Sequence, residues 1–233
     1  MVESPTVAIV WPCGLSVERY AAQGTEIRVP RSRCPECRRE LVFWSGYWRY
    51  VREQGEHRLF IRRGRCQRCG RTHALLPSFL LGRRLDPVAV IGQALALGVS
   101  GLGMLKVAAE VGVPHSTARD WRRRHRARAP ALAAGFAALR VELGDEVTTL
   151  PEVPEQAALA ALGAAWAARR GLLGLWGFAS VMSCGSWLGT NKTPLWAPLG
   201  DRRFMAPIPS NAPPEVVLCP VTRPKPVLCS ASR

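Results

Sequence analysis

Four cysteines in two C-x-x-C pairs are the residues of this sequence whose type and spacing most plainly suggest chemistry. The pairs are Cys34-Pro-Glu-Cys37 and Cys66-Gln-Arg-Cys69, and 28 residues separate them. Each short turn can offer two sulfurs from one backbone loop, and zinc prefers four such thiolates in a tetrahedron. Gly70 follows the last cysteine and allows the chain to curl back towards the metal. We therefore predict one structural Zn²⁺ bound by Cys34, Cys37, Cys66 and Cys69.

Redox-active or simply buried thiols are the alternatives for these cysteines. A catalytic zinc would need an open coordination position, and four thiolates leave none for water. His57 and His73 are rival ligands, but each is a single histidine beside a complete set. We expect a surface or hydrogen-bonded role for both.

A second motif covers residues 104–123 and predicts two helices that pack across a tight turn. Gly112 stands where the turn requires a positive φ, and Pro114 suits the first turn of the second helix. Seven positions carry the small, apolar or glycine residue that this packing needs: Val107, Ala108, Val111, Gly112, Val113, Ala118 and Trp121. An ordinary helical hairpin is the alternative to a DNA-binding helix-turn-helix.

The outward positions of the second helix are polar and basic, which is typical of a helix that enters the DNA major groove. Arg119 and Arg123 lie four residues apart and should reach base edges from one face. The arginines beyond the motif should contact phosphate. The predicted DNA contacts are His115, Ser116, Arg119, Asp120, Arg122, Arg123, Arg124, Arg126 and Arg128.

The positive charge is concentrated in the half of the chain that holds both motifs. The net charge is +15 overall, and residues 1–128 hold 23 lysines and arginines against 10 aspartates and glutamates, a net of +13. Residues 129–233 hold 9 against 7, a net of +2. A positive surface attracts phosphate, so nucleic acid is the first partner to consider and anionic membrane the second.

The segment between the cysteine pairs suits the β-hairpin of a zinc ribbon. Residues 41–51 are rich in β-branched and aromatic side chains, Gln54-Gly55 is a turn signal, and residues 59–65 return. Its aromatic residues Tyr47, Trp48 and Tyr50 could stack on bases, but we expect them mainly on a core face. For the neighbouring arginines, contact with phosphate is slightly favoured over a position on a solvated strand face, because the whole region is basic.

The elements predict an α+β protein in four parts. Residues 1–85 form an N-terminal segment plus the zinc ribbon, with residues 72–81 as an apolar connector. Residues 86–128 form a three-helix helix-turn-helix unit whose first helix opens at Asp86-Pro87. Residues 129–189 form an alanine-rich helical arm, and residues 190–233 a Pro-rich, largely irregular and poorly ordered tail. The uncharged run of residues 171–188 contains four glycines and three serines, which favours a buried helix or hairpin over a membrane span.

The order of zinc ribbon, connector and helix-turn-helix resembles the N-terminal DNA-binding head of bacterial insertion-sequence transposases. It is similar to a family of short bacterial proteins of uncharacterised role that share Cys-Pro-x-Cys, the Gly-Tyr-Trp-Arg-Tyr strand of residues 46–50 and Arg-Cys-x-x-Cys-Gly-Arg-Thr-His of residues 65–73. The resemblance spans about residues 25–130. It implies recognition of terminal repeats in double-stranded DNA, and in such transposases three acidic residues of a separate ribonuclease-H-like domain bind two metal ions.

That nuclease domain has no counterpart here, so we expect a protein that is not an enzyme. The carboxylates beyond residue 129 lie in no strand-rich stretch, whereas metal-assisted phosphoryl transfer needs several on a rigid sheet. They are Glu142, Asp145, Glu146, Glu152, Glu155, Asp201 and Glu215. The expected function is sequence-specific double-stranded DNA binding, by a transposase accessory or relic or by a transcriptional regulator. The alternatives are an adaptor that docks on a transposase or polymerase, and a nuclease with an unrecognised site.

Double-stranded DNA is the expected partner, with a transposase or a second copy of the chain as further candidates. No membrane partner and no small-molecule substrate are expected. The first fourteen residues show no basic leader and only a short apolar run, so we expect a cytoplasmic, nucleoid-associated protein.

Overall fold

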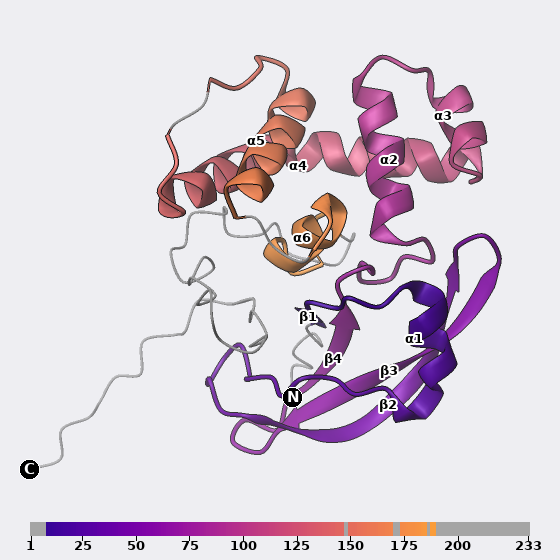
Figure 1. Ribbon diagram of the computed structural model, residues 1–233, viewed down its shortest axis with the longest axis vertical. Coiled ribbons are helices and arrows are strands. Elements are labelled where there is room, and N and C mark those ends of the chain that lie inside the picture. The colour runs from indigo at the N-terminus through magenta and orange to yellow at the C-terminus, as the bar shows by residue number, and fades with distance from the viewer. Residues whose placement is uncertain (1–7, 147–148, 170–172, 186, 190–233) are drawn as a thin grey trace, which may run out of the picture.

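A computed structural model describes residues 8–146, 149–169, 173–185 and 187–189. They form the predicted α+β protein, with a sheet and one helix in the lower part of Figure 1 and five helices above them. In chain order the elements are β1 (Ala8–Trp11), α1 (Val17–Gln23), a 3-10 turn (Gly24–Glu26), β2 (Leu41–Arg52), β3 (Glu56–Cys66), β4 (Thr72–Pro77), α2 (Val88–Val99), α3 (Met104–Glu110), α4 (His115–Glu142), α5 (Pro154–Arg169) and α6 (Leu175–Met182). The predicted tail of residues 190–233 lies outside the described residues.

The sheet is mixed and has the order β1-β4-β3-β2. β2 and β3 form the predicted antiparallel hairpin, which turns at Gln54 and Gly55, both with positive φ. The expectation of a plain connector at residues 72–81 is wrong, because Thr72–Pro77 is a strand that pairs antiparallel with β3 and parallel with β1. Its parallel partner lies some sixty residues earlier in the chain, and local sequence patterns cannot show such a pairing (Ala8 pairs with Ala74).

One face of the sheet packs under α1. The Ser16 hydroxyl accepts a hydrogen bond from the Arg19 N–H at 3.2 Å and so caps the helix, as its residue type favours. Tyr20 of α1 is fully buried, and its hydroxyl donates to the Phe60 carbonyl of β3 at 3.1 Å. Leu59 and Ile61 of β3 are fully buried as well, so this face carries the core of the sheet.

The aromatic residues of β2 do not join that core, which contradicts the expectation for Tyr47, Trp48 and Tyr50. All three are exposed to solvent. Val51 is the buried residue of this stretch. β2 is the edge strand, and α1 packs against β3 rather than β2, so these aromatic side chains gain little cover.

The helices form a layer joined to the sheet by a polar link. α2, α3 and α4 contact one another, α5 packs along α4, and α6 contacts α2, α5 and β1. Asp86 does not cap α2, because it accepts two hydrogen bonds from the Arg52 guanidinium of β2 at 3.1 and 2.9 Å. Arg49 of β2 also donates to the Leu81 carbonyl at 2.9 Å. The hairpin is thereby fastened to the segment that leads into α2.

α4 is one helix of 28 residues that continues through Pro130. A proline inside a helix removes the hydrogen bond to the carbonyl four residues earlier and costs about 3 kcal/mol. The buried face of α4 nevertheless continues across it, through Ala129, Leu132, Ala133 and Phe136. The boundary expected between residues 128 and 129 therefore lies inside α4. Among the described helices, none is both long and apolar enough to cross a membrane.

Candidate metal centre and basic helix

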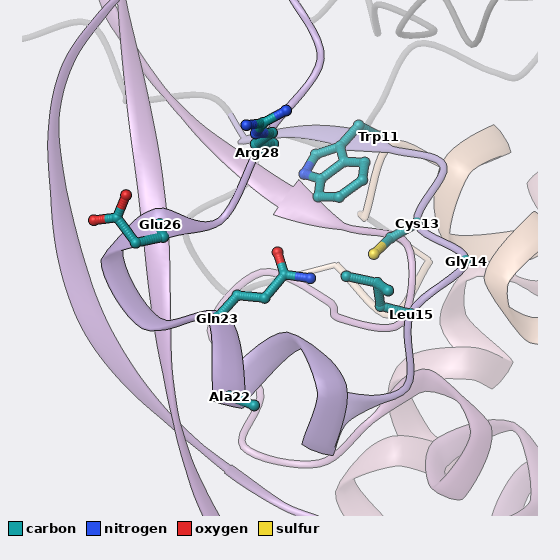
Figure 2. A pocket seen from close by; sticks show the side chains of 8 residues that line it. All are labelled: Trp11, Cys13, Gly14, Leu15, Ala22, Gln23, Glu26 and Arg28. Atoms are coloured by element: carbon teal, nitrogen blue, oxygen red, sulfur yellow. The ribbon is translucent and has the colours of Figure 1, made fainter.

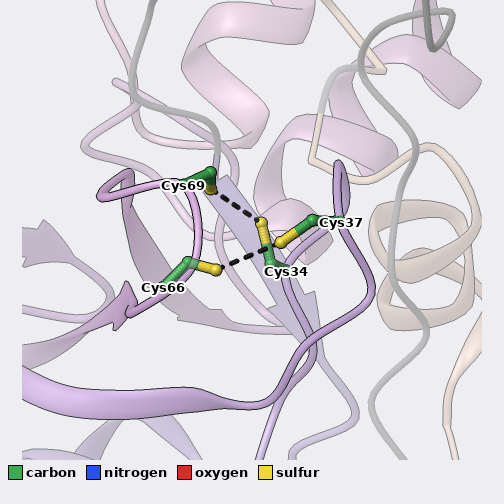
Figure 3. A group of neighbouring side chains, drawn as sticks. All are labelled: Cys34, Cys37, Cys66 and Cys69. Carbon is green, nitrogen blue, oxygen red and sulfur yellow. Dashed lines mark hydrogen bonds between the residues drawn. The ribbon is translucent and has the colours of Figure 1, made fainter. Parts of the chain in front are cut away.

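The four predicted cysteine ligands meet at the end of the hairpin, with their ligand atoms within 4.8 Å of one another (Figure 3). The sulfurs of Cys34 and Cys69 lie 3.6 Å apart, and those of Cys37 and Cys66 lie 3.2 Å apart. A tetrahedral zinc with Zn–S bonds of about 2.3 Å would hold its sulfurs about 3.8 Å apart. The cluster fits one metal ion, and zinc is the ion that a four-thiolate set of this size prefers.

The two cysteine knuckles share one backbone geometry. In each, the N–H four residues after the first cysteine donates to that cysteine's carbonyl at 2.9 Å, from Arg38 to Cys34 and from Gly70 to Cys66. Both donor residues have positive φ, 60° at Arg38 and 72° at Gly70. Glycine at this place is a visible sequence signal, whereas the equivalent role of Arg38 follows only from the spacing of the knuckles.

Two residues that sequence analysis did not assign to the centre support it. Glu36 of the first knuckle forms an ion pair with Arg71, which follows the second knuckle. His73 is buried, and its Nε2 lies 3.6 Å from the Cys34 sulfur. His73 therefore contacts a ligand from behind, which agrees with the hydrogen-bonded role expected of it. Such outer contacts orient metal ligands.

The surroundings also favour a thiolate at Cys66. Burial raises the pKa of this thiol, but hydrogen bonds from the backbone of its knuckle and from Cys37 bring the pKa down to about 7. Metal binding requires the deprotonated sulfur, so less free energy is needed to ionise this ligand.

The second motif folds as two packed helices, α3 and α4, joined by a turn at Gly112 with φ of 68°. Val107, Ala118 and Trp121 are buried in the seam between them. The Val113 N–H donates to the Ala108 carbonyl at 3.0 Å and closes the turn. The steric pattern read from the sequence is therefore satisfied by packing.

The nine residues expected to contact DNA all lie on α4 but differ in what surrounds them. His115, Ser116, Arg119, Arg123 and Arg126 are exposed, whereas Asp120, Arg122, Arg124 and Arg128 are half-buried. Among the described residues, no carboxylate lies within ion-pair distance of Arg119. Arg119 is thus an exposed cation near the start of the helix.

Asp120 binds two of the arginines on its own helix. It accepts hydrogen bonds from Arg123 at 2.7 Å and from Arg124 at 2.5 Å. Partial burial raises the pKa of Asp120, but the hydrogen bonds from Arg124 and Arg123 outweigh it and lower the pKa below its ordinary value. Asp120 is therefore ionised at neutral pH and compensates part of the charge of α4.

Glu155 of α5 binds the next pair of arginines. This buried carboxylate accepts a hydrogen bond from Arg126 at 2.8 Å and lies 4.0 Å from the Arg122 guanidinium. Burial lowers the pKa of Arg128, which lies further along the same helix. The structure thus gives Arg126 and Arg124, which the sequence assigns to phosphate, carboxylate partners within the protein.

A shallow pocket lies between β1, α1 and the segment after α1 (Figure 2). Trp11, Cys13, Gln23 and Arg28 are among the residues that line it. Burial raises the pKa of the Cys13 thiol to about 11, so at neutral pH it stays protonated and is a poor nucleophile. We therefore assign no chemical role to Cys13 in this pocket.

A comparison with protein families gives a match that covers the metal cluster and the first turns of α4. A family model described as a domain of unknown function (DUF6431) matches residues 34–121. The matched segment runs from the first cysteine of the metal cluster to Trp121 in the seam of α3 and α4. No curated protein and no solved structure matches the chain. The match thus places the metal cluster, α3 and the start of α4 in one family model and attaches no activity to them.

Proposed function

We propose that the protein binds double-stranded DNA in a sequence-specific way, with α3 and α4 as a helix-turn-helix and α4 in the major groove. The observation that carries this proposal is the exposed start of α4. His115, Ser116 and Arg119 face solvent there, while Ala118 and Trp121 anchor the same turns in the seam. A helix fixed on one side and polar on the other can present side chains to base edges.

The metal centre would serve this function as a structural zinc ribbon. Four thiolates hold the two ends of a long hairpin, and that hairpin is fastened to the segment before α2 by Arg52 and Asp86. Zinc binding would then stabilise the framework on which the helical unit is mounted. The resemblance to transposase heads suggests a transposase accessory or relic, and a transcriptional regulator is the other role of this kind.

Selection of bound fragments from randomised duplexes, followed by sequencing, tests the proposal. An enriched motif is expected. Recovery of all fragments alike would favour the alternative of an adaptor that docks on a transposase or polymerase and contacts DNA without sequence preference. Loss of duplex in Mg²⁺ or Mn²⁺ would point to a nuclease.

The Arg119→Ala variant tests whether Arg119 contacts a base of the enriched motif. It should weaken the binding free energy by about 1–3 kcal/mol for that motif and by little for random duplex, because a base contact is lost and no phosphate contact is. Arg19→Ala removes an equal charge from an exposed position of α1 and should change neither affinity. Equal losses on selected and random duplex for Arg119→Ala would contradict base reading by α4.

A further inference from the structure

The outer strand of the sheet, β2, carries a row of large side chains that face solvent. Trp44 is 61 % exposed and Tyr50 is 51 % exposed. The full set is Val42, Phe43, Trp44, Tyr47, Trp48 and Tyr50. Folding does not require this row, since Val51, Leu59 and Ile61 already fill the core face. Where several of these side chains share one face, an exposed aromatic patch of this kind marks a binding surface.

Arginines of the partner strand β3 lie over three of these rings. Each guanidinium carbon is within 4.5 to 5.4 Å of a ring centroid, in the pairs Arg58 with Trp48, Arg62 with Phe43 and Arg65 with Trp44. A cation over a ring is held in place but keeps its full charge. The patch is therefore both aromatic and positively charged.

The register of the hairpin places several of these groups on one face. Trp48 lies opposite Phe60, and Tyr50 lies opposite Arg58. Side chains two apart on a strand point to the same side, so Trp48 and Tyr50 share a face with Phe60 and Arg58. Gly46 belongs to this row as well, and a Cβ built on it would lie only 2.2 Å from the Phe60 ring. The glycine thus leaves room for the Phe60 ring, which meets the Trp48 ring edge to face at an interplanar angle of 65°.

The charge of this patch decides between the occupants that an aromatic sheet face could take. The cations on the face of Trp48 and Tyr50 are Arg58 and Arg62, and the Arg62 guanidinium also donates to the Ile27 and Thr25 carbonyls. The acidic residues of the hairpin, Glu53 and Glu56, sit at the turn. Two copies of so basic a face would repel each other, whereas phosphate would be attracted. In a duplex the faces of the bases are covered by their neighbours, so flat exposed rings fit unpaired bases.

We propose that the outer face of the β2–β3 hairpin binds single-stranded nucleic acid. Trp48 and Tyr50 stack on unpaired bases, and Arg58, on the same face of the hairpin, contacts a phosphate. From Phe43 to Tyr50 the strand runs about 23 Å at 3.3 Å per residue, which suits a site of about four nucleotides. This surface is separate from the exposed start of α4, so the proposal does not rest on duplex binding there.

Binding of a fluorescently labelled oligothymidylate to the full zinc-loaded chain tests the proposal, because oligothymidylate forms no duplex with itself. Anisotropy titration should show binding that weakens as salt increases. Trp48→Ala and Tyr50→Ala should each weaken it about five- to a hundredfold through the loss of stacking. Val141→Ala, which shortens an exposed apolar side chain at the far end of α4, should have no effect.

Arg58→Ala provides a variant that leaves every ring in place. It should weaken oligothymidylate binding and reduce its salt dependence by about one unit. Zinc content and circular dichroism of each variant confirm that the chain is folded. Any folded hairpin variant that binds oligothymidylate as the wild-type chain does would count against the proposal.

The two binding surfaces can be tested separately by measuring each variant with both oligothymidylate and the selected duplex. Hairpin variants should lose oligothymidylate and keep the selected duplex, whereas Arg119→Ala should do the opposite. Failure of the duplex selection alone would overturn the proposed function and leave this inference standing. Absence of oligothymidylate binding would overturn the inference, and so would hairpin variants that change only the oligomeric state, because the patch would then bind a second copy.

Discussion

Several arginines of α4 and three arginines of β3 meet different kinds of partner within the protein. On α4 the partners are carboxylates: Asp120 for Arg123 and Arg124, and Glu155 for Arg126 and, at 4.0 Å, Arg122. On the hairpin, Arg58, Arg62 and Arg65 lie over aromatic rings. The positive charge of the first set is partly compensated by carboxylates. Among the described residues the second set has no carboxylate partner, although Arg62 also donates to the Thr25 and Ile27 carbonyls.

This difference shows that a count of basic residues does not locate the basic surface. A carboxylate neutralises an arginine, while an aromatic ring only orients it. Among the described residues, two arginines of α4 have no carboxylate partner, Arg119, which is exposed, and Arg128, which is half-buried. The Arg126 side chain is still 63 % exposed although it is paired, and exposed ion pairs are weak. DNA phosphate could therefore compete with Glu155 for Arg126, and the difference between the two regions can be tested by removing carboxylates.

Removal of the metal should have the largest effect and should act on the hairpin side of the comparison. We expect about one zinc per chain. The double substitution Cys34→Ser with Cys66→Ser should remove it and lower the free energy of unfolding by several kcal/mol, on the order of the about 10–16 kcal/mol that zinc binding supplies to zinc-finger peptides. Metal analysis and thermal unfolding measure both effects.

The matched control for metal removal is Cys13→Ser, which changes a buried cysteine outside the cluster. It should keep the full zinc content. A double cysteine variant that kept its zinc would rule out the four-cysteine centre.

Glu155→Gln should have the next largest effect, because it removes the main compensating charge of α4. The buried carboxylate loses its charged hydrogen bond with Arg126, at a cost of about 1–3 kcal/mol in the free energy of unfolding. At the same time Arg122 and Arg126 gain uncompensated charge. Affinity for random duplex should rise, and its salt dependence should steepen by about one unit.

Glu152→Gln is the control for that experiment, since it removes the same charge from an exposed position three residues earlier. It should change neither the stability nor the salt dependence by a comparable amount. Similar results for the two variants would mean that the ion pairs of Glu155 do not limit the charge that α4 offers to DNA.

What the sequence could predict about these regions was local. The two C-x-x-C knuckles and the turn at Gly112 each depend on residues within a few positions of one another, so spacing and residue type suffice. All of these agree with the structure.

The errors concern partners that lie far apart in the chain. The pairing of β4 with β1 depends on a strand near the N-terminus. The ion pair of Arg126 with Glu155 links α4 to α5. The aromatic residues of β2 have the composition of a core strand. Whether such a strand is covered depends on its place at the edge of the sheet, and its own residues do not encode that place.

A buried histidine of α4 tests whether the helix tolerates one more positive charge beside its arginines. His125 is fully buried, and burial lowers its pKa below the ordinary value of 6.5, although Glu155 partly opposes the shift. Below pH about 6.5, His125 therefore binds a proton more readily in the unfolded chain than in the folded chain. The free energy of unfolding is then highest near neutral pH and falls on acidification. The loss can reach about 1.4 kcal/mol per pH unit.

Denaturant unfolding between pH about 7 and about 5 measures this slope. His125→Phe keeps a ring in the site and removes the titrating group, so the slope should become shallower. His115→Phe changes an exposed histidine of the same helix and should leave it unchanged. An unaltered slope in His125→Phe would show that acid sensitivity arises elsewhere.

The smallest expected effect comes from Asp120→Asn, which removes the carboxylate that pairs with two further arginines of α4. Arg123 and Arg124 lose an ionised partner, and because the Arg123 contact is largely exposed the free energy of unfolding should fall by only about 0.5 kcal/mol. Affinity should rise severalfold for selected and random duplex alike, as expected for added charge that meets phosphate.

Asp120 is half-buried, and its accessible carboxylate could also read a base, since a carboxylate can accept a hydrogen bond from cytosine. Repeating the duplex selection with Asp120→Asn separates the two roles. If Asp120 only compensates charge, the selected motif stays the same and Glu110→Gln, on the exposed surface of α3, gives a smaller rise in affinity. A changed base at one position of the motif would instead make Asp120 a reading residue, and its pairing with Arg123 and Arg124 would then orient the reader rather than neutralise the helix.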